Sequence, residues 1–246
     1  MATISDPRRL AADPINPMGT DGFEFVEYAH PKPEELHRLF KLMGYVAVAR
    51  HKTKRITVYR QGDINYLVNE EPGTHGFDFV AAHGPCAPSM AFRVVDAKLA
   101  YERALALGAE PADVTAAQKT LDVPAIKGIG GSLLYFVDRY GKKGSAYDAE
   151  FDWLGLKDIH PEGAGLFYID HLTHNVHRGR MDEWADFYER LFNFREIRYF
   201  DIEGKLTGLK SKAMTSPCGK IRIPINESTD DKSQIQEYLS AYHGEG

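Results

Sequence analysis

The organisation of this chain can be worked out from the stretch Tyr168-Ile169-Asp170-His171-Leu172-Thr173-His174-Asn175-Val176. Its branched and apolar residues predict a β-strand that opens a structural module. Side chains alternate between the two faces of a strand, so His171 and His174 would point to opposite faces, with His171 facing inward. A single histidine does not make a metal centre. Any partner ligands of His171 must therefore come from other parts of the fold.

The residues that follow this strand predict one helix and three further strands. The helix is expected over 181–192, where Trp184, Phe187, Tyr188 and Leu191 recur at helical spacing. The strands are expected at 195–201, 209–214 and 221–226, with a turn at 217–220. Together with the strand over 168–176, these elements form a βαβββ module.

The same order of elements occurs at the start of the chain. A strand over 23–29 precedes a helix that begins at Pro33, where a proline costs nothing, and ends at Gly44. Strands are then expected at 45–50, 56–60 and 64–69. A variant of the pattern lies between these two modules, with a strand over 89–95, a helix over 97–107 and a strand over 132–137.

These patterns predict an α+β fold built from repeated βαβββ modules in two domains. The segment 140–165 has no clear periodicity, so the boundary is placed there, between a first domain at 1–150 and a second at 151–246. Modules one and two can bury each other's sheet faces. The third module lacks such a partner, which predicts either an incomplete second domain or self-association into a homo-oligomer. A helix over 231–242 would lead into a further module.

Composition narrows the class of protein. The chain has 246 residues, 43% of them hydrophobic, and a formal net charge of -5. The negative charge argues against a nucleic-acid partner, since such binding depends on lysine and arginine neutralising phosphates. Cys86 and Cys218 form no spaced set, which favours a reducing compartment. The sequence shows neither a signal-peptide pattern nor a membrane span, so we expect a cytoplasmic protein without a membrane partner.

Three histidines at 171, 174 and 177 have the spacing HxxHxxH, which invites a metal-site interpretation. On a strand, however, His171 and His177 would lie roughly 20 Å apart, too far to share an ion. At most one of the three therefore belongs to a given site. The alternative is that each is an ordinary hydrogen-bonded strand histidine.

A second candidate group is polar and uncharged. Ser211 lies on one predicted strand, Asn226 ends the next and Gln234 opens the following helix. Three neutral hydrogen-bonding side chains could hold a phenol hydroxyl. The alternative is ordinary turn and cap chemistry, with Gln234 on an exposed helix face.

Several long motifs resemble the bacterial 4-hydroxyphenylpyruvate dioxygenase family. They cover most of the chain, and the clearest are 22–27, 128–141, 169–176, 211–217, 222–227 and 233–238. The resemblance implies the vicinal oxygen chelate fold, which is built from βαβββ modules. It also implies that 1–150 is the N-terminal domain of that fold and that 151–246 is the first half of the catalytic domain.

The resemblance further implies a non-haem Fe(II) enzyme of tyrosine and phenylalanine catabolism. Such an enzyme converts 4-hydroxyphenylpyruvate and O2 to homogentisate and CO2. In this family two histidines and a glutamate hold the iron. By residue matching, His171 is the first iron ligand, and Ser211, Asn226 and Gln234 line the substrate pocket. The second histidine and the glutamate match no residue of this chain, which predicts that the chain is truncated at its C-terminus.

Two alternative functions are compatible with parts of this interpretation. A 4-hydroxymandelate synthase would use the same ligands and substrate but would oxidise the benzylic carbon. A metal-free protein of the same fold would act only in binding, and the two unmatched ligands favour this alternative for the chain taken alone.

Overall fold

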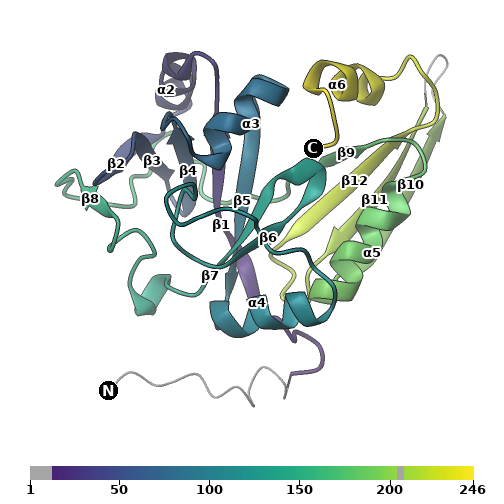
Figure 1. Cartoon of the computed structure of the whole chain (residues 1–246), viewed down its shortest axis with the longest axis horizontal. Helices are drawn as coiled ribbons and strands as arrows, with labels where there is room; N and C mark the ends of the chain where they lie inside the picture. The colour runs from purple at the N-terminus through teal and green to yellow at the C-terminus, as the bar shows by residue number, and fades with distance from the viewer. Residues whose placement is uncertain (1–12, 204–207) are drawn as a thin grey trace.

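The computed structural model describes residues 13–203 and 208–246, and its strands form two mixed sheets (Figure 1). The first sheet has eight strands in the order β6-β7-β5-β1-β4-β3-β2-β8, and the second has four in the order β10-β11-β12-β9. The strands of the first sheet are β1 (Thr20–Ala29), β2 (Val46–His51), β3 (Ile56–Gln61), β4 (Ile64–Asn69), β5 (Cys86–Val94), β6 (Ala125–Lys127), β7 (Leu133–Val137) and β8 (Phe151–Trp153).

The remaining elements complete the α+β arrangement. The strands of the second sheet are β9 (His174–Val176), β10 (Arg195–Glu203), β11 (Gly208–Thr215) and β12 (Arg222–Ser228). The helices are α2 (Pro33–Leu42), α3 (His75–His83), α4 (Ala97–Ala106), α5 (Met181–Phe192) and α6 (Gln234–Tyr242), with short 3-10 turns η1 (Ile129–Gly131) and η2 (Gly141–Lys143). Within residues 13–203 and 208–246, no helix combines the length and the apolar character that crossing a bilayer requires.

Strand pairing shows the repeated module directly. The first strand of each module pairs in parallel with its last strand: β1 with β4, β5 with β7, and β9 with β12. The antiparallel pairing of β1 with β5 joins modules one and two into a single sheet. This confirms the prediction that those two modules pair with each other.

The two helices with the clearest apolar stripes form where their sequences predict. In α2, Pro33 occupies the first turn and Leu36 and Phe40 are buried. Gly44 follows the helix with a φ of +89°, a conformation that glycine adopts without strain. Helix α5 ends at Asn193, whose left-handed backbone provides the cap.

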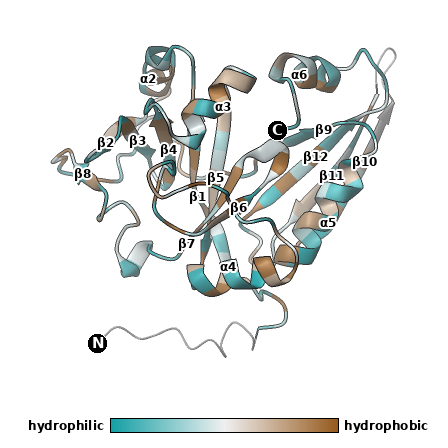
Figure 2. Ribbon diagram, in the orientation of Figure 1, coloured by the Kyte–Doolittle hydropathy of each residue, from teal (hydrophilic) through white to brown (hydrophobic). Residues whose placement is uncertain are grey.

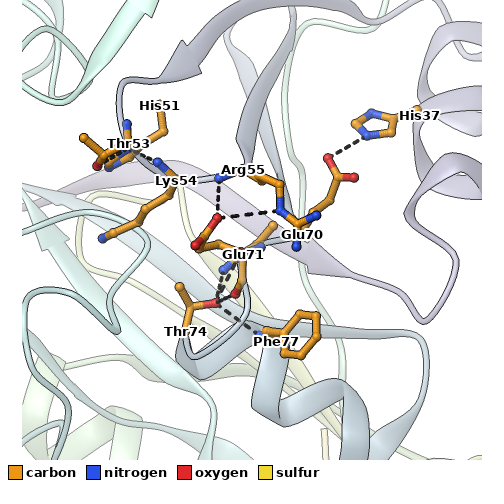
Figure 3. Close-up of polar contacts among 10 residues, drawn as sticks. His37, His51, Thr53, Lys54, Arg55, Glu70, Glu71, Thr74 and Phe77 are labelled. Carbon is orange, nitrogen blue, oxygen red and sulfur yellow. Dashed lines mark hydrogen bonds and ion pairs between the residues drawn. The ribbon is translucent and has the colours of Figure 1, made fainter.

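Helix α3 was not predicted from the sequence, and local polar contacts fix its start. The Thr74 hydroxyl accepts a hydrogen bond from the Phe77 N–H at 3.4 Å, a typical N-cap contact. Just before it, Glu71 accepts a hydrogen bond from the Arg55 N–H at 2.8 Å (Figure 3). The Glu71 contact ties the turn between β4 and α3 to the residue that precedes β3.

The predicted strand over 168–176 is too long. Only His174–Val176 pairs as β9, and residues 168–173 have no regular structure. Just before β9, the Leu172 N–H donates to the Arg222 carbonyl oxygen at 3.2 Å. A strand extends only as far as its ladder of hydrogen bonds. Pairing with β12 therefore sets the length of β9, rather than the strand propensity of its residues.

Helix α6 brings the following residues back to β9, as Figure 1 shows. The helix begins after Ser233, whose hydroxyl accepts a hydrogen bond from the Gln236 N–H at 3.2 Å. Beyond the helix, the Asn175 N–H donates to the Gly246 carbonyl oxygen at 2.7 Å, and the Gly246 N–H donates to the Asn175 carbonyl oxygen at 3.2 Å. This reciprocal pair is an antiparallel contact.

One hydrophobic cluster joins the two sheets. Phe92 of β5 and Phe136 of β7 are buried against Phe192 at the end of α5, with ring centroids 5.4 and 6.0 Å away. Figure 2 shows hydrophobic residues along β7, α4 and α5. The expectation that module three lacks a partner is thus wrong for its α5 side, which packs on module two because both surfaces carry large aromatic residues.

Candidate functional site

A row of side chains crosses the second sheet and contains two of the predicted pocket residues. In the strand register, Phe200 lies opposite Ser211, Ser211 opposite Asn226, and Asn226 opposite Asn175. Residues opposite each other on neighbouring strands project from the same face of a sheet. We call these four residues the polar row. The Asn226 Nδ2 atom donates to Asn175 Oδ1 at 3.4 Å, which links the two amides.

The polar row lies on the face of the sheet that points away from α5. The alternate residues of β11 and β12 contact that helix: Lys212 Nζ lies 2.7 Å from Asp182 Oδ1, and the Met181 N–H donates to Glu227 Oε2 at 3.1 Å. Because side chains alternate along a strand, Ser211 and Asn226 must occupy the opposite face. Ser211 is buried and Asn226 is half-buried there.

Gln234 does not join the polar row. It is the first residue of α6 and its side chain is exposed. The structure therefore brings Ser211 and Asn226 together as neighbours and leaves Gln234 on the surface. Its place in a substrate pocket stays a prediction.

His171 lies on the surface and does not face inward as expected. Its side chain is 51% exposed, and its Nδ1 atom lies 2.8 Å from Asp170 Oδ2. The hydrogen bond from His171 lowers the pKa of Asp170, and nearby Arg222 lowers it further. The ring turns outward because residues 168–173 leave the sheet before the strand begins. The role of His171 as a metal ligand stays a prediction.

In contrast to the exposed His171, His174 is part of the hydrophobic core. Its ring is 6% exposed, and its Nε2 atom lies 2.6 Å from the Tyr188 hydroxyl oxygen. Burial lowers the pKa of His174 to about 4, so the imidazole is neutral at physiological pH. His177 is exposed, and its backbone N–H donates to Glu245 Oε1 at 3.0 Å. His171 and His174 therefore do not form a common site.

The described residues do not provide a complete iron centre. In residues 13–203 and 208–246, no three histidine, cysteine, aspartate or glutamate side chains come together closely enough to hold a metal ion. His171 has one feature of a ligand. When its Nδ1 carries the proton, Asp170 orients the ring and leaves Nε2 available, as carboxylates do for metal-bound histidines.

Two members of the polar row were missed from the sequence. Asn175 was overlooked beside the histidines, although it lies on the same predicted strand. Phe200 is 39% exposed and places an aromatic ring at the end of the row on β10. Alternation along each predicted strand identifies which residues share a face. The order of the strands, which sets their neighbours, comes only from the structure.

Comparison with known families identifies the chain. The family model described as Hydroxyphenylpyruvate dioxygenase, HPPD, N-terminal, matches residues 15–152, which is more than half of the chain. This chain belongs to the 4-hydroxyphenylpyruvate dioxygenase family. A second model, of the Glyoxalase/Bleomycin resistance protein/Dioxygenase superfamily, matches residues 168–244. The family resemblance and the repeated-module α+β fold are thereby confirmed. The division at residue 150 stays a prediction.

Individual relatives agree with this assignment. The chain is 56% identical over 232 residues to a 4-hydroxyphenylpyruvate dioxygenase of Pseudomonas sp. (strain P.J. 874), covering 94% of this chain and 65% of the relative. It is 57% identical over 239 residues to a protein named Hemolysin VllY of Vibrio vulnificus, covering 95% of this chain and 67% of that protein. The chain thus spans about two thirds of the length of these relatives.

Solved structures show the same fold. A xylose isomerase-like TIM barrel/4-hydroxyphenylpyruvate dioxygenase fusion protein superposes with a TM-score of 0.74 at 34% identity, covering 92% of this chain and 36% of the other. A mutant of 4-hydroxymandelate synthase from Streptomyces coelicolor superposes with a TM-score of 0.75 at 22% identity, covering 93% of this chain and 69% of the other. The second likeness shows the fold alone.

Proposed function

We propose that this chain serves an Fe(II)-dependent dioxygenase activity that converts 4-hydroxyphenylpyruvate and O2 to homogentisate and CO2. Family membership supports the reaction class. The observation that carries the proposal for these residues is the polar row, because it aligns Ser211 and Asn226 beside the ring of Phe200 on one face of the sheet.

In this proposal the polar row is the wall on which the phenol end of the substrate lies. A serine hydroxyl can donate and accept, and an asparagine amide offers both a carbonyl and an N–H group. Two such neutral groups can bond a phenol hydroxyl in either direction. Neither adds a charge that would favour phenolate over phenol. Phe200 provides an aromatic ring next to them, and the guanidinium carbon of Arg198 lies 5.6 Å from the centroid of that ring.

The iron-binding part of the proposal is narrower. His171 would supply one ligand through Nε2, with Asp170 holding Nδ1. The described residues do not fit a complete Fe(II) centre, so further ligands would have to come from elsewhere. Only the substrate wall and this one ligand are therefore assigned to the chain.

Substrate binding tests the proposal without requiring iron. Calorimetric titration of the chain should show about tenfold tighter binding of 4-hydroxyphenylpyruvate than of phenylpyruvate, which lacks the phenol hydroxyl. Equal affinity for the two acids would contradict the role of the polar row.

A product assay then separates the candidate functions. The chain is loaded with Fe(II) under anaerobic conditions, mixed with 4-hydroxyphenylpyruvate and exposed to O2, and the products are separated by chromatography. Homogentisate establishes the dioxygenase, whereas 4-hydroxymandelate identifies the synthase. Selective binding with neither product favours the second candidate, a metal-free binding role.

A further inference from the structure

A cavity of about 550 Å3 beside the eight-stranded sheet is not used by the proposed function. Its lining includes Trp153 of β8, an edge strand of the first sheet (Figure 1), and several residues of the segment 139–148. Its volume is within the range of small-molecule sites. Its lining combines charged groups, the buried Glu24 and Arg60 and the half-buried Arg93, with the aromatic rings of Tyr140 and Trp153.

Arg60 is the most unusual residue of this cavity. Its side chain is 4% exposed, yet in the described parts of the chain no carboxylate lies within ion-pair distance of it. Its Nε donates to Asn65 Oδ1 at 2.6 Å and its Nη1 donates to the Ile159 carbonyl oxygen at 3.0 Å, and both acceptors are neutral. Burial lowers the pKa of Arg60. The Glu24 and Asp63 carboxylates act on this pKa in the opposite direction without an ion-pair contact. Both groups that accept hydrogen bonds from the guanidinium are neutral, which is unusual because desolvation of a buried charge is costly.

The buried Glu24 forms an ion pair with the half-buried Arg93 in the same cavity. Arg93 Nε lies 2.6 Å from Glu24 Oε2, and Glu24 is 4% exposed. Burial raises the pKa of Glu24, and the contact with Arg93 opposes that shift. Two arginines and one glutamate at the buried end leave one positive charge in excess.

The charged groups at the mouth of the cavity lie in two contacts, of which Asp63 with His160 is an ion pair only when the histidine is protonated. Asp148 Oδ2 lies 3.7 Å from Arg139 Nη2, and Asp63 Oδ1 lies 3.6 Å from His160 Nδ1. All four side chains are more than one-third exposed, so water screens their charges. The excess positive charge thus remains at the buried end.

Aromatic rings accompany both arginines. The guanidinium carbon of Arg60 lies 5.3 Å from the ring centroid of Trp153, and that of Arg93 lies 5.4 Å from the ring centroid of Tyr140. Stacking holds each guanidinium plane in place. The Asp148 carboxylate accepts a hydrogen bond from Trp153 Nε1 at 3.1 Å, which orients that ring. The cavity therefore combines a buried guanidinium with two aromatic rings among charged and polar residues.

We propose that this cavity binds a small organic monocarboxylate. Its carboxylate would pair with the Arg60 guanidinium, and its apolar part would lie beside Trp153 and Tyr140. The planar guanidinium suits a carboxylate because two parallel N–H groups can donate to its two oxygens. The site is separate from the polar row and does not depend on the proposed dioxygenase activity.

Benzoate is the probe for this site, and calorimetry and the thermal unfolding midpoint are the readouts. Benzoate should bind the chain and raise the midpoint, since a ligand that binds only the folded state stabilises it. Arg60→Met should weaken benzoate binding about 10- to 100-fold, as expected for a lost charged hydrogen-bonded contact. Arg38→Met, at an exposed arginine of α2, is the matched control and should leave the affinity unchanged.

Glu24→Gln gives a test in the opposite direction. It removes the only buried negative charge of the cavity with little change in shape, so benzoate should bind several-fold tighter. General damage to the fold would not produce tighter binding. If Arg60→Met fails to fold, Trp153→Leu takes its place. It leaves the charges intact and should weaken benzoate binding several-fold.

Three outcomes would overturn the proposal. One is that Arg60→Met binds benzoate as the wild type does. Another is that Glu24→Gln binds it no more tightly. The third is that inorganic phosphate or chloride competes as well as acetate does, which would make the site a general anion site. Asn226→Ala should leave benzoate binding unchanged, so failure here is distinguishable from failure of the proposed function.

Discussion

The Nε2 atom of His174 lies 2.6 Å from the hydroxyl oxygen of Tyr188, and this contact ties β9 to α5 in the core of the second sheet. Both side chains are buried, and the two rings are stacked with centroids 5.7 Å apart. The pair shows that the second histidine of the HxxHxxH stretch has a structural role.

The burial of His174 predicts a loss of stability in mild acid. The unfolded chain protonates this histidine below about pH 6.5, whereas the folded protein keeps it neutral down to about pH 4. The unfolded state thus binds more protons in this window, and the free energy of unfolding falls as the pH drops from about 6.5 to about 4. The shift corresponds to about 3 kcal/mol.

Urea titrations across this pH range check that prediction. His174→Gln should lose less stability on acidification than the wild type does, because glutamine does not titrate. His177→Gln, at an exposed histidine, is the control and should follow the wild-type curve. Parallel curves for all three proteins would show that His174 does not contribute to the acid sensitivity.

The polar row predicts a change in substrate affinity. Asn226→Ala should weaken binding of 4-hydroxyphenylpyruvate by about tenfold, the effect of losing one or two neutral hydrogen bonds. Phenylpyruvate binding should change little, because that acid has no phenol hydroxyl. Lys212→Ala, on the same sheet but facing α5, is the control. Equal losses for the two acids would remove Asn226 from the phenol-binding wall.

The contact of His171 with Asp170 predicts that substituting either residue lowers the Fe(II) affinity, by different amounts. Fe(II) affinity, measured anaerobically by competition with a chromogenic chelator, should fall most in His171→Ala. Asp170→Asn should lower it by about tenfold, since the carboxylate only orients the ring. His177→Ala should retain the wild-type affinity. If His171→Ala and His177→Ala bind Fe(II) equally well, His171 is not a ligand.

The aromatic cluster between the sheets predicts a large stability effect. Phe192→Ala should lower the free energy of unfolding by about 3–5 kcal/mol, because it leaves a cavity against Phe92 and Phe136. Phe187→Ala, where the ring is only partly buried, should cost clearly less. Chemical unfolding followed by circular dichroism measures both. Similar losses would show that the contact between modules two and three adds little.

Local patterns predicted much of this fold. The helix over 181–192 has the predicted bounds because its apolar stripe, its acidic first turn and its left-handed Asn193 cap all agree. The strand over 168–176 was overextended because the end of a strand depends on its neighbour in the sheet. The wrong expectation that His171 faces inward follows from the same error, because His171 lies before β9 begins. The outward turn of that ring could not be seen without the structure.

The sequence also contains a pattern that indicates the buried position of Arg60, but this pattern was not used in the prediction. Arg60 alternates with Ile56 and Val58 along β3, so the three side chains project from the same face. A charged residue at an otherwise apolar set of positions indicates a buried charge that needs compensation. Which groups surround it depends on Glu24 and Arg93, which come from other strands.

The parallel pairing of the first and last strands of each module also determines the order in which the chain can fold. During synthesis, β1 emerges well before β4, so its parallel ladder forms only after the intervening helix and hairpin are made. Contacts this distant in sequence slow folding and expose unpaired backbone for longer. We therefore expect each module to close as a unit once its final strand has left the ribosome, and insertions within a module to be tolerated less well than insertions between modules.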